Sequence, residues 1–262
     1  LLEDARQAGY QTQILHWYYG DNPTQAEVNS TRDDYRASIT EMDRMIRESG
    51  LGADAIVTLE PEWNAPGGDL AGWEGWNDVL LEAIDIIQQG SGAQVCLYAG
   101  WWDNQNRITA SMGRAALRAD CTSMMKMAAS EDTSLGGQAT PEQNEAKARG
   151  AVDDAIRFSH FMRRKFMLPV RWDYFMVSEY DNNPGDGADW SAIQREVTTD
   201  LCSRIPEIQD TGVMAIAWMA YQDSPDQHNL VYGQAEYHKG LITFPDGARK
   251  PNIWDIWNTC GQ

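Results

Sequence analysis

The chain has 262 residues, of which 42% are hydrophobic and 23% are charged. This balance is typical of a soluble protein, and the length suffices for a single large domain over residues 1–262. The formal net charge of −18 disfavours a nucleic-acid partner, because affinity for the phosphate backbone comes from clustered Lys and Arg. We also expect no membrane span, because no apolar stretch reaches the roughly 18 residues that one requires.

The cysteines suggest the compartment in which the protein works. Four are present, Cys96, Cys121, Cys202 and Cys260, and none has the C-x-x-C spacing of a zinc or redox motif. An even number in an acidic, Trp-rich chain favours two disulfides and a secreted or extracellular protein. We expect Cys202 to pair with Cys260, because this bond would tie the C-terminal tail to a helix.

Strands and helices alternate along the first half of the chain. Residues 11–19 are rich in β-branched and aromatic side chains and end at a Gly-Asp-Asn-Pro turn, which predicts a strand. Apolar residues at helical spacing predict helices over residues 35–48 and 76–89. Apolar runs predict one strand that ends at Glu60 and another over residues 94–99.

The second half continues this alternation. Met and Lys in residues 122–127 suit a helix equally well, but their place in the alternation favours a strand. The other predicted elements are a helix over residues 141–167, a strand that ends at Glu179, a helix over 190–208, a strand over 212–220 and a terminal helix over 251–258. Such βα repeats with continuous apolar strands are typical of parallel sheets.

Six strands are predicted, whereas a closed (β/α)8 TIM barrel needs eight. Residues 1–9 read as the end of a helix with its glycine stop, so we expect two strands of an α/β barrel to precede this chain. A doubly wound parallel sheet is the competing architecture.

Two carboxylates stand where an apolar strand gives way to a polar loop. Glu60 lies in Leu59-Glu60-Pro61, and Glu179 lies in Ser178-Glu179-Tyr180. A (β/α) barrel keeps its catalytic residues at this end of its strands. Hydrolysis of a glycosidic bond needs a pair of acids, because one donates a proton while the other attacks or activates water.

These motifs resemble those of the clan A retaining glycoside hydrolases, the (β/α)8 group that includes endoglucanases and mannanases. The resemblance implies that Glu60 is the general acid/base after strand four and that Glu179 is the nucleophile after strand seven. Glu62 is a second candidate for the acid, because it shares strand parity with Glu60 if the strand continues that far.

The same resemblance extends to residues that would bind the sugar. His16 is similar to a histidine that some members carry after strand three, and Trp218 to the strand-eight tryptophan beneath the scissile sugar. Several of the eleven tryptophans fall at or just after predicted strand ends, where their rings could stack on sugars. The expected substrate-binding residues are His16, Trp17, Trp63, Asn64, Trp101, Trp102, Asp103, Trp218 and Tyr221.

Two residues depart from the pattern of the group. Leu59 stands where the group has an Asn that binds the sugar 2-hydroxyl, and Lys126 stands where an aromatic hydroxyl is expected. A non-catalytic, carbohydrate-binding barrel and a polysaccharide lyase therefore remain alternatives to a glycosidase. We expect no cofactor and no metal, because His228 and His238 match no familiar ligand spacing.

Overall fold

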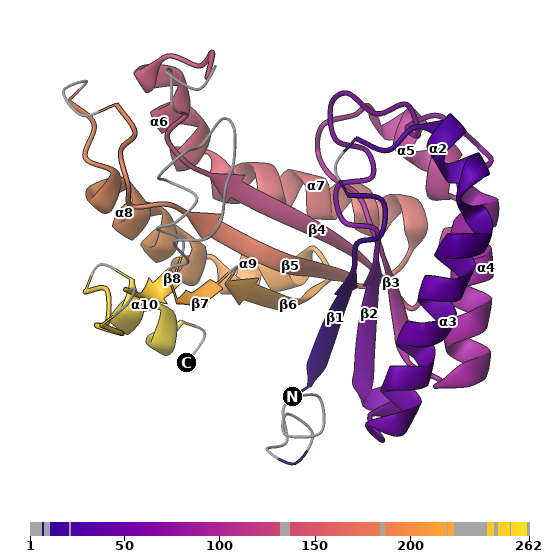
Figure 1. Ribbon diagram of the computed structural model, residues 1–262. Coiled ribbons are helices and arrows are strands. Elements are labelled where there is room, and N and C mark those ends of the chain that lie inside the picture. Colours follow the sequence, from indigo (N-terminus) through magenta and orange to yellow (C-terminus); the bar gives the residue numbers. More distant parts are fainter. Residues whose placement is uncertain are drawn as a thin grey trace. The chain divides into compact units, whose positions relative to one another are not determined.

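A computed structural model gives the structure of the protein (Figure 1). The residues that it describes are 7, 11–20, 22–131, 137–183, 187–218, 220–222, 240–243, 246–251 and 253–260. The chain divides into two compact units, which we describe separately. Unit 1 consists of Leu1–Met124 and Phe161–Arg171, and unit 2 consists of Met125–His160 and Trp172–Gln262. A single domain over residues 1–262 stays a prediction.

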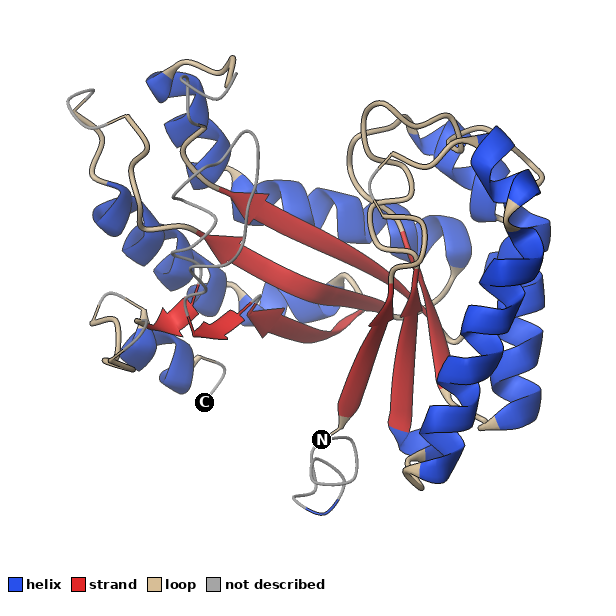
Figure 2. Cartoon of the chain, viewed as in Figure 1, coloured by secondary structure: helices blue, strands red, loops and turns tan. Residues whose placement is uncertain are grey.

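The main sheet has six strands, which are neighbours in the order of the sequence (Figure 2). The strands are β1 (Thr12–His16), β2 (Ala55–Leu59), β3 (Gln94–Tyr98), β4 (Cys121–Ala128), β5 (Val170–Val177) and β6 (Val213–Trp218). The pairings β1–β2, β2–β3 and β3–β4 are parallel. A doubly wound sheet reverses its strand order, so the sequential order excludes that alternative.

The described residues of unit 1 include the helices α2 (Gln25–Ser30), α3 (Arg32–Glu48), α4 (Trp76–Gly90) and α5 (Gln105–Met112). Short 3₁₀ turns cover Gly52–Asp54 and Ala115–Leu117. Helix α3 buries Ile39 and Ile46 on one stripe and carries acidic residues in its first turn, where they favour the helix dipole. Strand β2 is buried along its whole length, as expected of a strand covered on both faces.

Unit 2 contains α6 (Pro141–Arg149), α8 (Trp190–Ser203), α9 (Ile205–Asp210) and α10 (Trp254–Thr259), and α7 (Ala151–Phe166) contributes to both units. A small parallel pair is formed by β7 (Ala220–Gln222) and β8 (Gly240–Ile242). The predicted helices over 141–167 and 190–208 are each two helices. Gly150 ends α6, and Pro206, which has no backbone N–H, stands in the first turn of α9.

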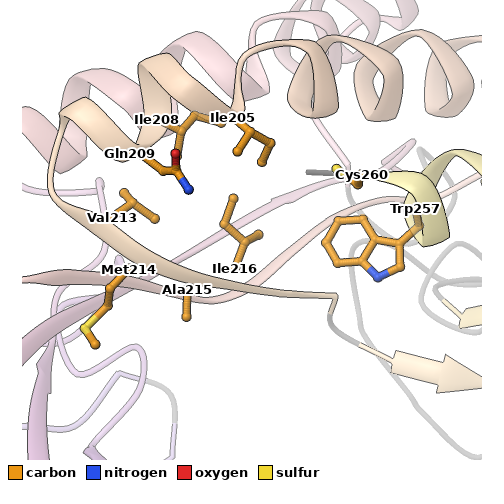
Figure 3. A pocket seen from close by; sticks show the side chains of 9 residues that line it. All are labelled: Ile205, Ile208, Gln209, Val213, Met214, Ala215, Ile216, Trp257 and Cys260. Atoms are coloured by element: carbon orange, nitrogen blue, oxygen red, sulfur yellow. The ribbon is translucent and has the colours of Figure 1, made fainter. Parts of the chain in front are cut away.

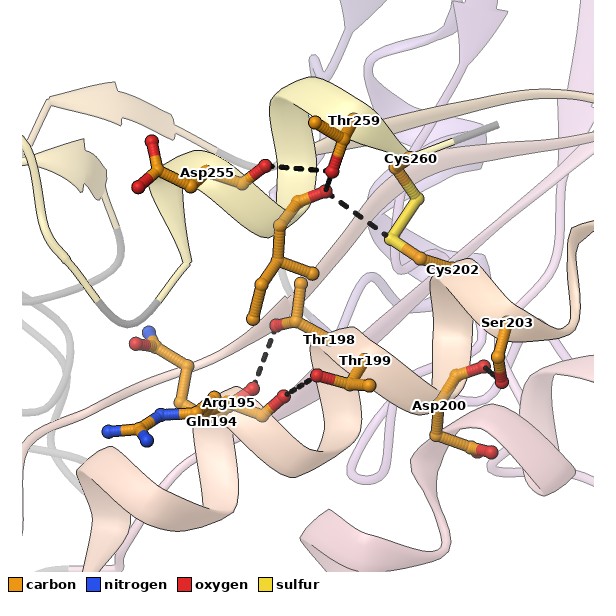
Figure 4. Close-up of a disulfide and its surroundings, with 11 residues drawn as sticks. Gln194, Arg195, Thr198, Thr199, Asp200, Cys202, Ser203, Asp255, Thr259 and Cys260 are labelled. Atoms are coloured by element: carbon orange, nitrogen blue, oxygen red, sulfur yellow. Dashed lines mark hydrogen bonds between the residues drawn. A yellow bond between two sulfur atoms is a disulfide. The ribbon is translucent and has the colours of Figure 1, made fainter. Parts of the chain in front are cut away.

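Both cysteine pairs form disulfides. Cys202 on α8 bonds Cys260, which follows α10, with their Cα atoms 4.9 Å apart (Figure 4). This confirms the predicted pairing of the C-terminal segment. Cys96 and Cys121 are direct partners in the register of β3 and β4, and their bond joins these neighbouring strands.

Candidate active site

Glu60 is almost completely buried at the end of β2, with 1% of its surface exposed. Its Oε1 accepts from the backbone N–H of Tyr18 at 3.3 Å, and its Oε2 accepts from that of Tyr19 at 3.1 Å. His16 Nδ1 lies 3.0 Å from Oε1. A carboxylate only accepts, so Nδ1 carries the proton of this bond, and His16 Nε2 lies 3.0 Å from the hydroxyl oxygen of Ser38. Three donors thus surround Glu60 and hold the segment after β1.

Two tyrosines beside Glu60 have raised pKa values. Burial raises the pKa of the Tyr19 hydroxyl to about 12, and the charge of Glu60 adds to this rise. Burial is also the main reason that the pKa of Tyr35 lies well above its usual range, with Glu60 again contributing. Each hydroxyl becomes harder to ionise because water is excluded and a negative charge lies nearby.

The backbone around Glu60 is in a conformation that residues other than glycine rarely adopt. The φ angles of Glu60 and Glu62 are +48° and +65°, and Pro61 lies between them. A positive φ is unfavourable for glutamate, and a residue before proline is normally extended. Two local preferences therefore oppose the conformation of Glu60. Backbone bonds retain this turn: Glu60 N–H donates to the His16 carbonyl and Ala65 N–H to that of Glu62, each at 2.8 Å. Strain of this kind is concentrated at functional sites.

Glu62 lies two residues after Glu60 and differs from it in exposure. Its side chain is half-buried, whereas that of Glu60 is enclosed. A proton donor must reach the oxygen of the bond that breaks, which requires an accessible carboxyl group. Of these two carboxyl groups, that of Glu62 is the more accessible.

Trp63 and Asn64 form part of the core, although both were expected to contact substrate. Trp63 is 1% exposed, and its indole N–H donates to the carbonyl of Tyr98 at 2.6 Å. Asn64 is 2% exposed, donates to the Gly100 carbonyl at 2.9 Å and accepts from its N–H at 2.8 Å. Both amide atoms are thus bound to backbone, so Asn64 does not replace the sugar contact that Leu59 lacks.

Exposed aromatic residues follow β1 and β3. Trp17, Trp101 and Trp102 expose 43%, 44% and 46% of their surfaces, and Tyr18 exposes 38%. These two strands run parallel to the intervening β2, so their carboxyl ends lie at the same edge of the unit 1 sheet. A side chain at Gly100 would clash with the Trp102 ring, so the close approach of that ring requires glycine. The exposed rings offer stacking surfaces at this edge.

Asp103 lies at the same edge but is paired within its own segment. Its Oδ1 accepts from Arg107 Nη1 at 2.7 Å, and the same guanidinium donates to the carbonyl of Ala71. Asp103 thus orders the start of α5. Binding of a sugar hydroxyl by Asp103 stays a prediction.

In unit 2, Glu179 follows β5 and is partly exposed, at 21%. Lys250 Nζ lies 2.9 Å from its Oε1, and this lysine is 1% exposed. A buried ammonium strongly requires a negative partner. Sequence reasoning missed Lys250, because lysine is seldom fully buried and nothing in its neighbourhood signals that it is.

Lys126 does not stand in for a site residue. Its ammonium pairs with Asp154 of α7 at 2.6 Å, so this side chain of β4 faces the helix. Desolvation raises the pKa of Asp154, but hydrogen bonds and charges from Lys126 and Arg157 outweigh it and lower the pKa overall. The expectation that Lys126 replaces an aromatic hydroxyl near the nucleophile was therefore wrong.

Trp218 ends β6 and is half-buried. Its ring meets that of Trp257 edge to face, with centroids 5.2 Å apart, and packs against Ala129 and Met176. Its role beneath a sugar stays a prediction. Tyr221 belongs to β7, but its side chain lies outside the described part of the structure, as do His228 and His238.

A cavity of about 300 Å³ lies between α9, β6 and α10 (Figure 3). Ile205 and Ile208 line it from α9, Ile216 from β6, and Trp257 from α10. None of its lining residues is charged, so it offers no acid or base for hydrolysis.

Among the described residues, no group of three or more His, Cys, Asp or Glu side chains lies close enough together to hold a metal ion. No helix in the same residues is long and apolar enough to cross a membrane.

No family model and no curated protein matches the sequence. Solved structures do match, each at low sequence identity. The GH53 catalytic domain of Ignisphaera aggregans is 13% identical with a TM-score of 0.63, and the match covers 97% of this chain and 75% of that one. An endo-β-1,4-glucanase of Xanthomonas axonopodis is 11% identical with a TM-score of 0.59, and the match covers 98% of this chain and 75% of that one. A β-D-glucuronidase of Dictyoglomus thermophilum is 12% identical with a TM-score of 0.63, and the match covers 98% of this chain and 42% of that one.

These likenesses confirm the predicted fold class. The chain has the α/β architecture of the barrel-type glycoside hydrolases, with six strands in sequence order, and it spans three quarters of the first structures that it matches.

Proposed function

We propose that the protein is a retaining glycoside hydrolase that cleaves a polysaccharide or oligosaccharide, with Glu179 as its nucleophile. The observation that carries this proposal is a partly exposed carboxylate just after a buried strand, with one oxygen held 2.9 Å from the ammonium of a buried lysine. The likeness in fold to several glycoside hydrolases supports the reaction class.

We assign the acid/base role to Glu62. In the first step Glu179 attacks the anomeric carbon while Glu62 protonates the departing oxygen, which leaves a glycosyl ester on Glu179. In the second step Glu62 takes a proton from water, the water oxygen attacks the same carbon, and the Glu179 carboxylate leaves. This double displacement requires the two carboxyl groups to lie about 5–5.5 Å apart.

We assign binding rather than catalysis to the exposed rings of Trp17, Trp101 and Trp102. Sugars present apolar C–H faces on which aromatic rings stack, and these rings are available for that contact. We also propose an extracellular setting, because two disulfides persist most readily in an oxidising compartment.

The proposal is tested by assaying a polysaccharide panel for new reducing ends and then trapping the enzyme with a 2-deoxy-2-fluoro glycoside of the sugar that is cleaved. We expect mass spectrometry to find the sugar on the peptide that contains Glu179. A label on another residue, or product of inverted configuration, would refute the mechanism.

The acid/base is identified by azide rescue in two matched variants. Glu62→Ala should lose activity on poor leaving groups, keep it on activated aryl glycosides, and yield a glycosyl azide of retained configuration. Glu60→Ala should show no azide product. The reverse result would return the role to Glu60.

A second candidate is a sugar-binding barrel without activity. It is favoured by Leu59, because the amide of Asn64 is bound to Gly100 and cannot supply the missing contact. Binding on a glycan array without new reducing ends would support this alternative, and an unsaturated product absorbing in the ultraviolet would instead indicate a lyase.

A further inference from the structure

Lys250 and Glu179 form an ion pair whose two members differ in exposure to solvent. The ammonium is enclosed at 1% exposure, while the carboxylate retains 21%. The cation therefore approaches Glu179 from the protein side, and the carboxylate keeps an open side. A nucleophile needs this arrangement, because one side must be fixed while another meets the substrate.

The segment around Lys250 fixes its position from both directions. Before it, the Thr243 N–H donates to the carbonyl of Ala248 at 2.8 Å, and the Lys250 N–H donates to the carbonyl of Leu241 at 3.1 Å. After it, the Lys250 carbonyl accepts from the N–H of Trp254 at 2.9 Å, at the start of α10. The disulfide from Cys202 to Cys260 then joins α10 to α8 (Figure 4). The ammonium is thus preset before any substrate binds.

We propose that Lys250 is the positioning residue of Glu179 and assists both steps of the reaction; this inference rests on the proposed function. In the first step it holds one carboxylate oxygen in place and so orients the other for attack. When the ester forms, Glu179 loses its negative charge, and Lys250 donates to the ester carbonyl oxygen. In the second step the C–O bond to Glu179 breaks and the carboxylate leaves with the electron pair, next to the cation that stabilises it.

The inference predicts a specific kinetic defect in Lys250→Met. The leaving carboxylate is no longer stabilised, so hydrolysis of the glycosyl-enzyme should slow by about 100-fold. With an activated aryl glycoside, we expect a burst of aryl alcohol and a covalent intermediate visible by intact-protein mass spectrometry. Lys250→Arg should restore part of the rate, because it keeps a cation beside Glu179.

The matched control is Lys126→Met, which removes the same charge and a similar ion pair, that of Asp154, within the same unit. Its kcat should remain within about twofold of wild type, because this pair faces a helix. A Lys250→Met enzyme that folds by circular dichroism, retains the wild-type rate and accumulates no covalent intermediate would overturn the inference. An equal loss in both variants would also overturn it.

A second measurement does not depend on turnover. The infrared difference spectrum between the wild type and Glu179→Gln isolates the Glu179 carboxylate, and the same difference is recorded in the Lys250→Met background. At one fixed, neutral pH we expect the carboxylate stretching band to change frequency when Lys250 is removed, because a hydrogen bond to one oxygen makes the two C–O bonds unequal. Identical band positions in both backgrounds would reject the role of Lys250, whereas a wild type that cleaves no glycan would reject only the proposed function.

Discussion

At the scale of single residues, the two strand-end glutamates are in different environments. Glu60 is enclosed by donors, and Glu179 is partly open beside a buried cation. The sequence places each acid after an apolar strand, and the strand ends were predictable from that pattern. Which acid is buried was not predictable, because it depends on the path of residues 16–19 over Glu60. The burial of its partner Lys250 was not predictable either, because it arises from segments that are distant in the sequence.

We predict that Glu60→Gln destabilises the protein by roughly 3 kcal/mol, because the amide presents N–H groups to a site that contains only donors. Urea unfolding followed by circular dichroism measures this loss. Glu62→Gln makes the same chemical change two residues away, at a half-buried position, and should retain most of the stability. Equal losses in the two variants would show that Glu60 is not the anchor of this turn.

At the scale of elements, the long helices and the buried strands followed the predicted periods. Their interruptions were also present in the sequence as Gly150 and Pro206, but a strong apolar period continues across both residues. The short helices α2 and α5 were missed, because six to eight residues contain too few turns for a period to emerge. The pairing of Lys126 on β4 with a helix was not predicted, since alternation along a strand does not identify which face meets a helix.

The ion pair between Lys126 of β4 and Asp154 of α7 makes helix docking dependent on pH. The folded-state pKa of Asp154 is lowered from its ordinary value of 3.8, so its stabilising effect is present above that value and is lost as pH falls through the folded pKa. We predict that Asp154→Asn is less stable than wild type at about pH 6 and that this difference shrinks towards about pH 3. Unfolding free energies across this range measure the effect. A constant difference would contradict it.

At the scale of the whole molecule, the regular βα alternation was enough to predict the strand order. A sheet in sequence order requires only local connections, so the pattern in the chain maps directly onto its topology. The Cys202–Cys260 disulfide was predicted separately, from the even number of cysteines and the place of Cys260 near a terminal helix.

The two disulfides should differ in what their removal affects. The Cys202–Cys260 bond spans 58 residues and contributes about 4 kcal/mol in the loop-entropy account. Its double Ala variant should lose activity as well as stability, because α10 fixes Lys250. The Cys96–Cys121 double Ala variant, whose bond spans 25 residues, should lose stability with little change in kcat at a temperature where it is folded. Thermal melts and assays separate these outcomes, and equal activity in both variants would contradict the assignment.

The order of synthesis gives the pairing of Lys250 with Glu179 a further consequence. Strands β1 to β5 can pair one after another as the ribosome delivers them, because each neighbour in the sheet is the next strand made. Glu179 emerges soon after β5, whereas Lys250 is translated only after β6 and β8. Glu179 therefore lacks this counter-charge while those strands are being made, and the ion pair of the candidate site forms later than the pairing of β1 to β5.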